Sequence, residues 1–361
     1  MTAATVGENV VAEPRGATRG RAVWLISGLA VALVVLALVS AGVGQLPLTP
    51  LEVLHTLLRP LGIEVGTASA QPNAEAALWT IRFPRVAMSI LVGAALATAG
   101  LLMQAVFGNP LAEPAVVGVS SGAALGAAAS IVLGWTAFGG WMTAAAAFAM
   151  GLATTLLVYA ASRSGGRTEV VTLVLTGIAV NAVAQAGLAL FVFLGDTQSR
   201  EEIVFWQLGS LNGSMWRDVA IVLPVLLVAA VLAGVLAPKL DLLSLGERSA
   251  RHLGVNVEAL RAGTIVIVAL LVSVAVAFTG IIGFVGIVIP HLMRMILGPA
   301  HRPLLLASLL GGAVLLTAAD LGARTIVPYA DLPIGMLTAL VGGPFFFWLL
   351  RRTRAKAGGW G

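Results

Sequence analysis

Long apolar runs, separated by short polar segments, recur along almost the whole of this chain. An α-helix needs about 20 residues to cross a bilayer, and ten runs approach or exceed that length. They lie at roughly 22–43, 84–106, 114–134, 138–161, 170–194, 216–237, 259–280, 282–297, 304–326 and 333–350. The pattern predicts an all-α integral membrane protein with about ten transmembrane helices, in which Gly280, Gly283 and Gly286 make the break between the seventh and eighth the least distinct.

Two of the polar segments are long enough to hold structure of their own. The segment 44–79 has room for a short surface helix at 50–58. The segment 196–216 is polar but contains Trp206 and Trp216. Because tryptophan prefers the membrane–water interface, we expect a short helix lying on that surface.

The two ends of the chain are expected to flank a single transmembrane domain at 22–352. Residues 1–21 are polar and contain Pro and Gly, which predicts a disordered cytoplasmic tail. The first apolar run is longer than the core of a signal peptide and lacks its small-residue cleavage site, so we interpret it as a retained helix. Residues 353–361 form a short cytoplasmic C-terminal tail.

Composition supports a membrane protein and excludes several functions. Of the 361 residues, 59% are hydrophobic and 10% are charged, whereas a soluble domain carries about 25% charged residues. Cysteine is absent, which excludes disulfides, thiolate metal sites and cysteine nucleophiles. No nucleic-acid motif accompanies the net charge of +5.

The positive charges predict the orientation of the chain. With the N-terminus inside, 15 of the 21 Lys and Arg residues fall in inner segments and six in outer ones. The positive-inside rule therefore favours cytoplasmic N- and C-termini, and the opposite orientation would reverse that bias.

Three of the six outer arginines lie at the mouths of predicted helices: Arg82, Arg85 and Arg324. A single arginine at an interface usually extends its charge into water. Three arginines on the outer side run against the positive-inside bias, which favours an acidic partner outside the membrane. Asp320 lies four residues before Arg324, the spacing of an ion pair on one helix face.

The inner segment 240–254 has the pattern of a docking element rather than a merely solvated loop. Ser244 and Glu247 have capping-box spacing, and Gly254 is a natural helix stop. We expect two short cytoplasmic helices joined at Gly246. Their apolar side would consist of Leu245, Ala250, Leu253 and Val257, and their polar side of Glu247, Arg248 and Arg251.

A few polar residues lie within the apolar runs. Asn181 and Gln185 are one turn apart, and Gln104 precedes the turn that contains Asn109. Such side chains either line a water path or form interhelical hydrogen bonds. None of the four histidines is paired with another at a helical ligand spacing, so a haem- or metal-binding redox enzyme is poorly supported. His291 is expected to be a packing or hydrogen-bonding residue.

From about residue 79 to 352 the chain resembles the FecCD-type, BtuC-like permeases, the membrane subunits of type II ABC importers for iron-siderophores, haem and vitamin B12. The motifs that carry the resemblance are Arg82-Phe-Pro-Arg85, Asn109-Pro-Leu-Ala-Glu-Pro114, Gly118-Val-Ser-Ser-Gly122, Trp206-Gln-Leu-Gly-Ser210, Leu243-Ser-Leu-Gly246, Gly283-Phe-Val-Gly-Ile-Val-Ile-Pro-His291, Asp320-Leu-Gly-Ala-Arg324, Leu332-Pro-Ile-Gly335 and Gly343-Pro-Phe345.

The resemblance implies a homodimer in the bacterial inner membrane, two cytoplasmic ATPases that bind ATP and Mg, and an extracytoplasmic binding protein. It implies that Arg82, Arg85 and Arg324 face glutamates of that binding protein, and that Asn109 and Leu111 belong to a cytoplasmic gate. Gly108 stands where many relatives carry a charge. The implied ATPase-coupling residues are Leu243, Leu245, Gly246, Glu247, Ala250, Leu253 and Gly254.

The chain lacks a phosphate-binding loop, so nucleotide energy has to come from another chain and the protein itself is no enzyme. Among substrates, the segment from 204 to 212 most resembles the haem permeases of this family. That resemblance places haem ahead of ferric siderophore, with cobalamin third. An ion-coupled secondary transporter is the alternative class, suggested by a possible inverted repeat. Its weakness is the scarcity of intramembrane carboxylates, essentially Asp320 alone.

Overall fold

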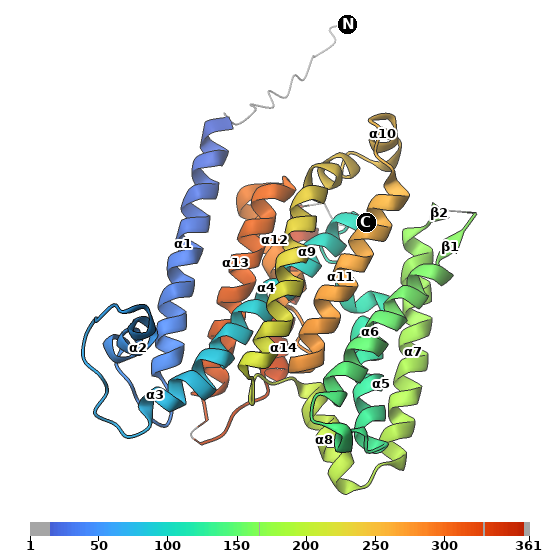
Figure 1. Ribbon diagram of the computed structural model, residues 1–361. Coiled ribbons are helices and arrows are strands. Elements are labelled where there is room, and N and C mark those ends of the chain that lie inside the picture. The colour runs from blue at the N-terminus through green and yellow to red at the C-terminus, as the bar shows by residue number, and fades with distance from the viewer. Residues whose placement is uncertain (1–14, 166, 328, 357–361) are drawn as a thin grey trace, which may run out of the picture.

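The computed structural model describes residues 15–165, 167–327 and 329–356 and shows a bundle of helices (Figure 1). Within these residues the helices that coincide with the ten apolar runs are α1 Arg15–Gly42, α4 Phe83–Phe107, α5 Val119–Val132, α6 Met142–Ala161, α7 Val170–Leu194, α9 Trp216–Leu243, α11 Val257–Thr279, α12 Val285–Leu297, α13 His301–Ala323 and α14 Ile334–Lys356. The predicted all-α membrane fold is confirmed. Seven helical stretches are long and apolar enough to span a bilayer, and α5, α12 and part of α14 are shorter apolar helices.

Short elements decorate both ends of the bundle. At the end opposite the start of α1 lie α2 Pro50–Leu58, α3 Ala74–Ala77 and α8 Thr197–Leu208 (Figure 1). The helices expected at 50–58 and within 196–216 are therefore both present. At the other end lie α10 Glu247–His252 and an antiparallel hairpin of β1 Arg163–Ser164 and β2 Arg167–Thr168.

The remaining described turns are short. Residues Arg59–Leu61, Pro114–Val117 and Trp135–Phe138 form 3₁₀ helices, and Leu78–Arg82 forms a π-helical turn.

Three predicted boundaries differ from the structure. The first helix begins at Arg15, so residues 15–21 are helical rather than a disordered tail, and residues 1–14 lie outside the described residues. At the other terminus, α14 extends to Lys356, and 357–361 are outside the described part. The second span is one helical stretch from Ala74 to Phe107, because α3 and the π-turn lead directly into α4.

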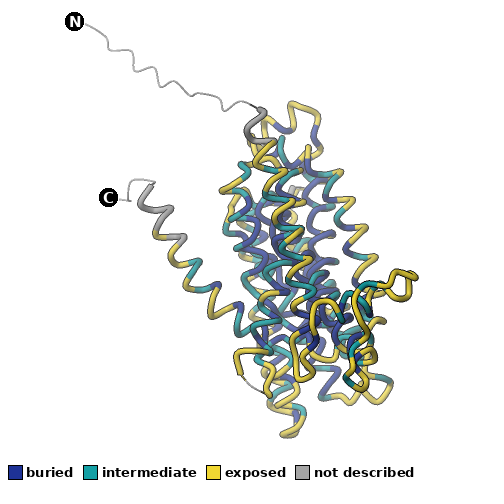
Figure 2. Tube along the Cα trace, turned by 90° about the vertical axis from the view of Figure 1, so that its left-hand side faces the viewer, coloured by how far each residue is buried: buried dark blue, intermediate teal, exposed yellow. Residues whose placement is uncertain are grey.

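Helix α4 forms the centre of the bundle and is surrounded by α9, α11, α12 and α13. In the most apolar part of the stretch 74–107, 89% of the residues are buried. Figure 2 shows buried residues, in dark blue, in the interior of the bundle. Glycines allow this close packing: a Cβ on Gly93 would lie 2.2 Å from the carbonyl oxygen of Gly312, and one on Gly100 would lie 1.9 Å from that of Gly286.

Apolar side chains also cover the outside of the bundle. Val171, Leu175 and Val183 on α7 are exposed, as are Leu227 and Val231 on α9. Because lipid is as apolar as these side chains, a membrane protein has no need to bury them.

Candidate functional site

The three outer arginines predicted from the sequence lie together. Arg82, Arg85 and Arg324 line one cavity of about 520 Å³, which Asp331 also lines. Arg82 and Arg85 are less than one-tenth exposed, and the Arg324 side chain is 11% exposed. The cluster therefore lies in a recess and offers little guanidinium surface to solvent.

Two of these arginines hold the end of α1. Arg82 donates from Nη1 to the carbonyl oxygens of Ala41 at 2.8 Å and Gly42 at 3.0 Å. Arg324 donates from Nη2 to Ser40 O at 2.5 Å and from Nη1 to Val43 O at 2.8 Å. The last carbonyls of a helix lack intrahelical partners and carry partial negative charge. The guanidiniums satisfy these carbonyls and fix α1 to the core.

The third arginine is held by carboxylates. Arg85 Nε lies 2.9 Å from Asp320 Oδ1, and its Nη1 lies 2.8 Å from Asp331 Oδ2. Arg324 Nε lies 3.3 Å from Asp320 Oδ2, which confirms the pair expected from their spacing. The Asp320 side chain is fully buried, whereas that of Asp331 is 34% exposed. Asp331 was not predicted from the sequence, and it is the most accessible charge of the network.

At the opposite end of α4, the helix stops at Gly108, which adopts a left-handed backbone with φ of 59°. Asn109 Oδ1 then accepts a hydrogen bond from the Leu111 N–H at 2.9 Å and fixes the turn. Gly108, Asn109 and Pro110 are exposed. The predicted gate residues thus form a short, locally braced turn at the C-terminal end of α4.

Gln104 lies just before that turn and is buried. Its Nε2 faces the carbonyl oxygens of Gly286 at 3.4 Å and Ile287 at 3.3 Å, while its Oε1 accepts from Arg294 at 2.9 Å. Gln104 thereby connects α4 to α12, and it also lines a cavity at the C-terminal end of α4.

Asn181 and Gln185, the two polar residues expected on α7, lie in different environments. Asn181 donates to Ala115 O at 3.3 Å and accepts a hydrogen bond from Ser121, so it connects α7 to the start of α5. Gln185 is exposed on the surface of α7. One polar residue is therefore an interhelical contact and the other remains available to line a pathway.

The loop at 240–254 differs from its predicted form. Helix α9 continues to Leu243, and Ser244 lies at its C-terminal end, where its hydroxyl donates to Asp241 O at 2.6 Å. The predicted capping box with Glu247 is wrong, because α10 begins after Gly246, whose φ is 102°. There is accordingly one short helix, α10, rather than two.

The predicted coupling residues occupy distinct positions on this loop. Leu245 and Leu253 are exposed, as is Gly254, so this loop presents two large apolar side chains to the outside. Ala250 and Leu243 are buried, so they support the loop from beneath.

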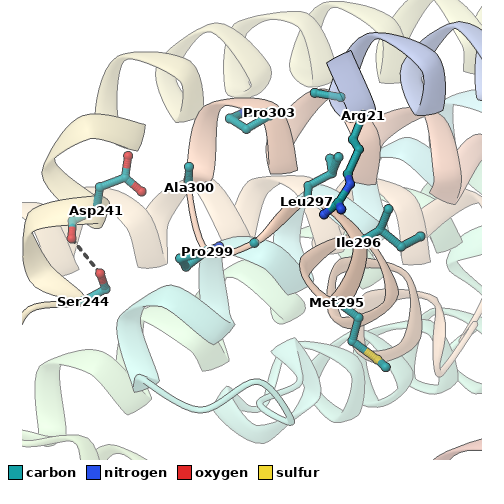
Figure 3. A pocket seen from close by; sticks show the side chains of 11 residues that line it. Arg21, Asp241, Ser244, Met295, Ile296, Leu297, Pro299, Ala300 and Pro303 are labelled. Carbon is teal, nitrogen blue, oxygen red and sulfur yellow. Dashed lines mark hydrogen bonds between the residues drawn. The ribbon is translucent and has the colours of Figure 1, made fainter. Parts of the chain in front are cut away.

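A cavity of about 910 Å³ lies beside this loop, between the start of α1, the end of α9 and the α12–α13 connection (Figure 3). Asp241 accepts from the backbone N of His301 at 2.8 Å and lies 2.6 Å from its Nδ1. This contact caps α13 with a carboxylate from α9. Among the described residues, no group of three or more His, Asp or Glu side chains is placed to hold a metal ion.

Comparison with known proteins gives consistent results. A sequence model of the FecCD transport family matches residues 32–352. The hemin transport system permease protein HmuU of Yersinia pestis is 37% identical, with 93% of this chain and 97% of HmuU covered. The cobalamin import system permease protein BtuC of Halobacterium salinarum is 36% identical, with 93% and 98% covered.

The Fe(3+)-citrate import system permease protein YfmE of Bacillus subtilis is 38% identical, with 90% of this chain and 93% of YfmE covered. A solved structure of a metal-chelate type ABC transporter in an inward-facing conformation matches with a TM-score of 0.80 and 32% identity. The match covers 91% of this chain and 99% of the chain in the solved structure.

Proposed function

Because the chain belongs to the FecCD transport family, as a multi-pass permease subunit of an ABC importer in the inner membrane, we propose that it imports haem delivered by an extracytoplasmic binding protein. It is a transport subunit and not an enzyme. The observation that carries the proposal is the pairing of an outer arginine cluster with an inner loop whose tip exposes Leu245 and Leu253, at opposite ends of one bundle.

The proposed assembly contains two copies of this chain and two ATPases. Each α10 would seat its exposed leucines against one ATPase, which binds ATP and Mg. The proposed orientation has cytoplasmic N- and C-termini. It is supported by the excess of basic residues in the inner segments and by the start of α1 and α10 lying at the same end of the bundle (Figure 1).

The outer cluster is proposed to receive acidic side chains of the binding protein. Since Arg85 is already paired with Asp331 at 2.8 Å, a carboxylate from the partner would engage it by taking the place of Asp331. Asp331→Asn removes the internal competitor and leaves the buried pair of Arg85 with Asp320 in place. We expect this variant to bind the binding protein more tightly.

The docking assay would measure affinity of the reconstituted complex for the binding protein, together with the ATP hydrolysis that it stimulates. Arg85→Glu should abolish both, with folding checked by gel filtration because this change leaves Asp320 unpaired. Arg59→Glu, at an exposed outer position paired with Glu75, serves as the charge-matched control. Unchanged affinity in both Asp331→Asn and a folded Arg85→Glu variant would refute the docking proposal.

The gate is proposed to be the turn at Asn109 and Leu111, which closes the inner mouth between transport cycles. Substrate leaving along α7 would pass Gln185, which is exposed.

Haem is proposed on the similarity to HmuU and on the segment around Trp206. Proteoliposomes containing the permease and its ATPase, with the binding protein outside, should accumulate haem only when ATP is inside. Cobalamin and ferric citrate, offered in parallel, test the alternatives suggested by BtuC and YfmE. ATP-dependent uptake of either in preference to haem would reassign the substrate. Uptake driven by an ion gradient without ATP would favour the secondary-transporter alternative.

A further inference from the structure

A buried arginine connects the inner loop to the hairpin that precedes α7. Arg261, in the second turn of α11, has only 4% of its side chain exposed. Its Nη2 forms an ion pair with Glu247 of α10, and its Nη1 donates to the carbonyl oxygen of Thr168 at 2.8 Å. One guanidinium thus bonds to two elements that are far apart in the sequence.

Thr168 is held from both sides. Its backbone N–H donates to Glu258 Oε2 at 3.0 Å, while its carbonyl accepts from Arg261. Glu258 also lies 3.8 Å from Arg261 and 3.9 Å from Arg251. Because Thr168 ends β2 only two residues before α7 begins, this grip fixes the start of α7.

The two ends of the network differ in their access to a partner. The Glu247 side chain is 46% exposed at the tip where α10 lies, whereas Arg261 is buried. A chain that binds α10 can reach Glu247 directly, but it reaches the hairpin only through Arg261. Because the Arg261 side chain is buried, losing Glu247 would leave a guanidinium charge inside the protein with one partner fewer, which is unfavourable. We therefore expect α10 and the hairpin to move together.

The same arginine also faces the turn at the end of α4. Arg261, Glu247 and Val170 line a cavity of about 460 Å³ whose other walls include Asn109 and Pro110. The link from α10 to α7 therefore borders the residues that the proposed function assigns to the inner gate.

We propose that Arg261 is a positioning residue that transmits displacement of α10 to the hairpin and the start of α7, so that an ATPase docked on α10 moves the inner mouth of the pathway. The proposal rests on the proposed function, because it takes α10 as the ATPase-docking helix. It adds a specific route, Glu247 to Arg261 to Thr168, by which docking and gating are connected.

The test separates ATP hydrolysis from transport in proteoliposomes that contain the permease, its ATPase and the binding protein with haem. Arg261→Gln should keep ATP hydrolysis within about twofold of wild type while lowering haem uptake per ATP by about tenfold, a loss of about 1.4 kcal/mol in coupling. Arg261→Lys, which retains the charge and one donor direction, should recover part of the coupling. Arg302→Gln, at an exposed inner position, is the control for loss of charge.

A second measurement follows the movement itself. The chain has no cysteine, so spin labels at Glu169→Cys and Ser249→Cys, two exposed positions beside the hairpin and on α10, report one distance. In the permease that retains Arg261, the distribution of that distance should be narrow. It should be the same in the complex without nucleotide and in the complex with ATP bound. It should broaden or shift on ATP binding in the Arg261→Gln background.

The outcomes are distinguishable. Parallel loss of ATP hydrolysis and uptake in Arg261→Gln, together with an unaltered distance, would show that Arg261 only stabilises the fold and would overturn the proposal. Uptake per ATP equal to wild type would overturn it as well. If the wild-type complex fails to take up haem, the proposed substrate fails, while the distance measurement still decides the role of Arg261.

Discussion

Alanine at Gly100 should destabilise the centre of the bundle, where α4 crosses α12. The added Cβ would lie 1.9 Å from Gly286 O, whereas ordinary contacts begin at 3.4 Å, so the two helices would have to separate by about 1.5 Å. The obstacle is backbone, which cannot rotate away as a side chain can. Overpacking costs about 1–3 kcal/mol, and separation would also stretch the Gln104 contacts with Gly286 and Ile287, each worth about 1 kcal/mol.

The expected loss in free energy of unfolding is therefore about 3 kcal/mol or slightly more. Equilibrium unfolding in mixed micelles of mild detergent and dodecyl sulfate, followed by helicity, would measure it. Gly263→Ala is the matched control, because its Cβ would meet nothing within 4 Å. Alanine favours a helix interior by about 1 kcal/mol over glycine. If Gly100→Ala unfolds at the same detergent composition as Gly263→Ala, the two helices do not pack as closely as described.

Three further changes test other parts of the molecule. Asp320→Asn should lower the free energy of unfolding by about 3–5 kcal/mol, since two buried arginines lose their shared countercharge. The control, Glu75→Gln, changes an exposed pair and should lower that free energy by at most about 1 kcal/mol. The Thr49 backbone N–H donates to Glu52 and lowers the pKa of that carboxyl. Helix α2 should therefore lose protection from amide exchange as the medium falls from about pH 6 to about pH 3, and Glu52→Gln should remove this dependence. Asn109→Ala removes a turn hydrogen bond worth about 1 kcal/mol and should raise passive haem leakage, while Asn109→Asp keeps the acceptor.

Each of these has a contrary outcome. Equal losses for Asp320→Asn and Glu75→Gln would mean that the buried charge is not held as described. The sign for Glu52 follows from its lowered pKa: the stabilisation is present above the unfolded-state pKa and is lost as pH falls through the folded-state value. Loss of the protection of α2 only at high pH, after correction for the intrinsic exchange rate, would contradict it. Equal haem leakage through the Asn109→Ala and Asn109→Asp variants would show that the hydrogen bond in this turn does not keep the gate closed.

Apolar runs predicted the helices because a span must be continuous, but they predicted helix ends less well. The run at 170–194 coincides with α7. The run at 84–106 begins too late, because Pro84 is compatible with a helix start and yet lies within a longer helix. The π-turn before it, in which the Phe83 N–H bonds to Leu78 O, is a local change of helical period beside a proline. Nothing in the hydropathy pattern signals such a turn.

Local spacing also revealed some contacts and concealed others. The pair of Asp320 and Arg324 was predictable because its members are four residues apart on one helix. The contacts of Arg82 with Ala41 and of Arg261 with Thr168 join residues 41 and 93 positions apart. Such pairings depend on the packing of helices, which one sequence does not specify.

The arginines at both ends of the bundle share one physical constraint. A charge near a bilayer is costly unless it is paired, so an arginine kept for a partner is expected to hold a partner within its own chain meanwhile. Arg85 is held by Asp331, whose side chain is 34% exposed and therefore replaceable. Arg261 is 4% exposed and donates to the backbone carbonyl of Thr168, which is itself buried. A partner that contacts the exposed Glu247 cannot take the place of that carbonyl. The proposed outer contact can therefore work by replacing a carboxylate, whereas the proposed inner link has to work by moving groups that stay bonded.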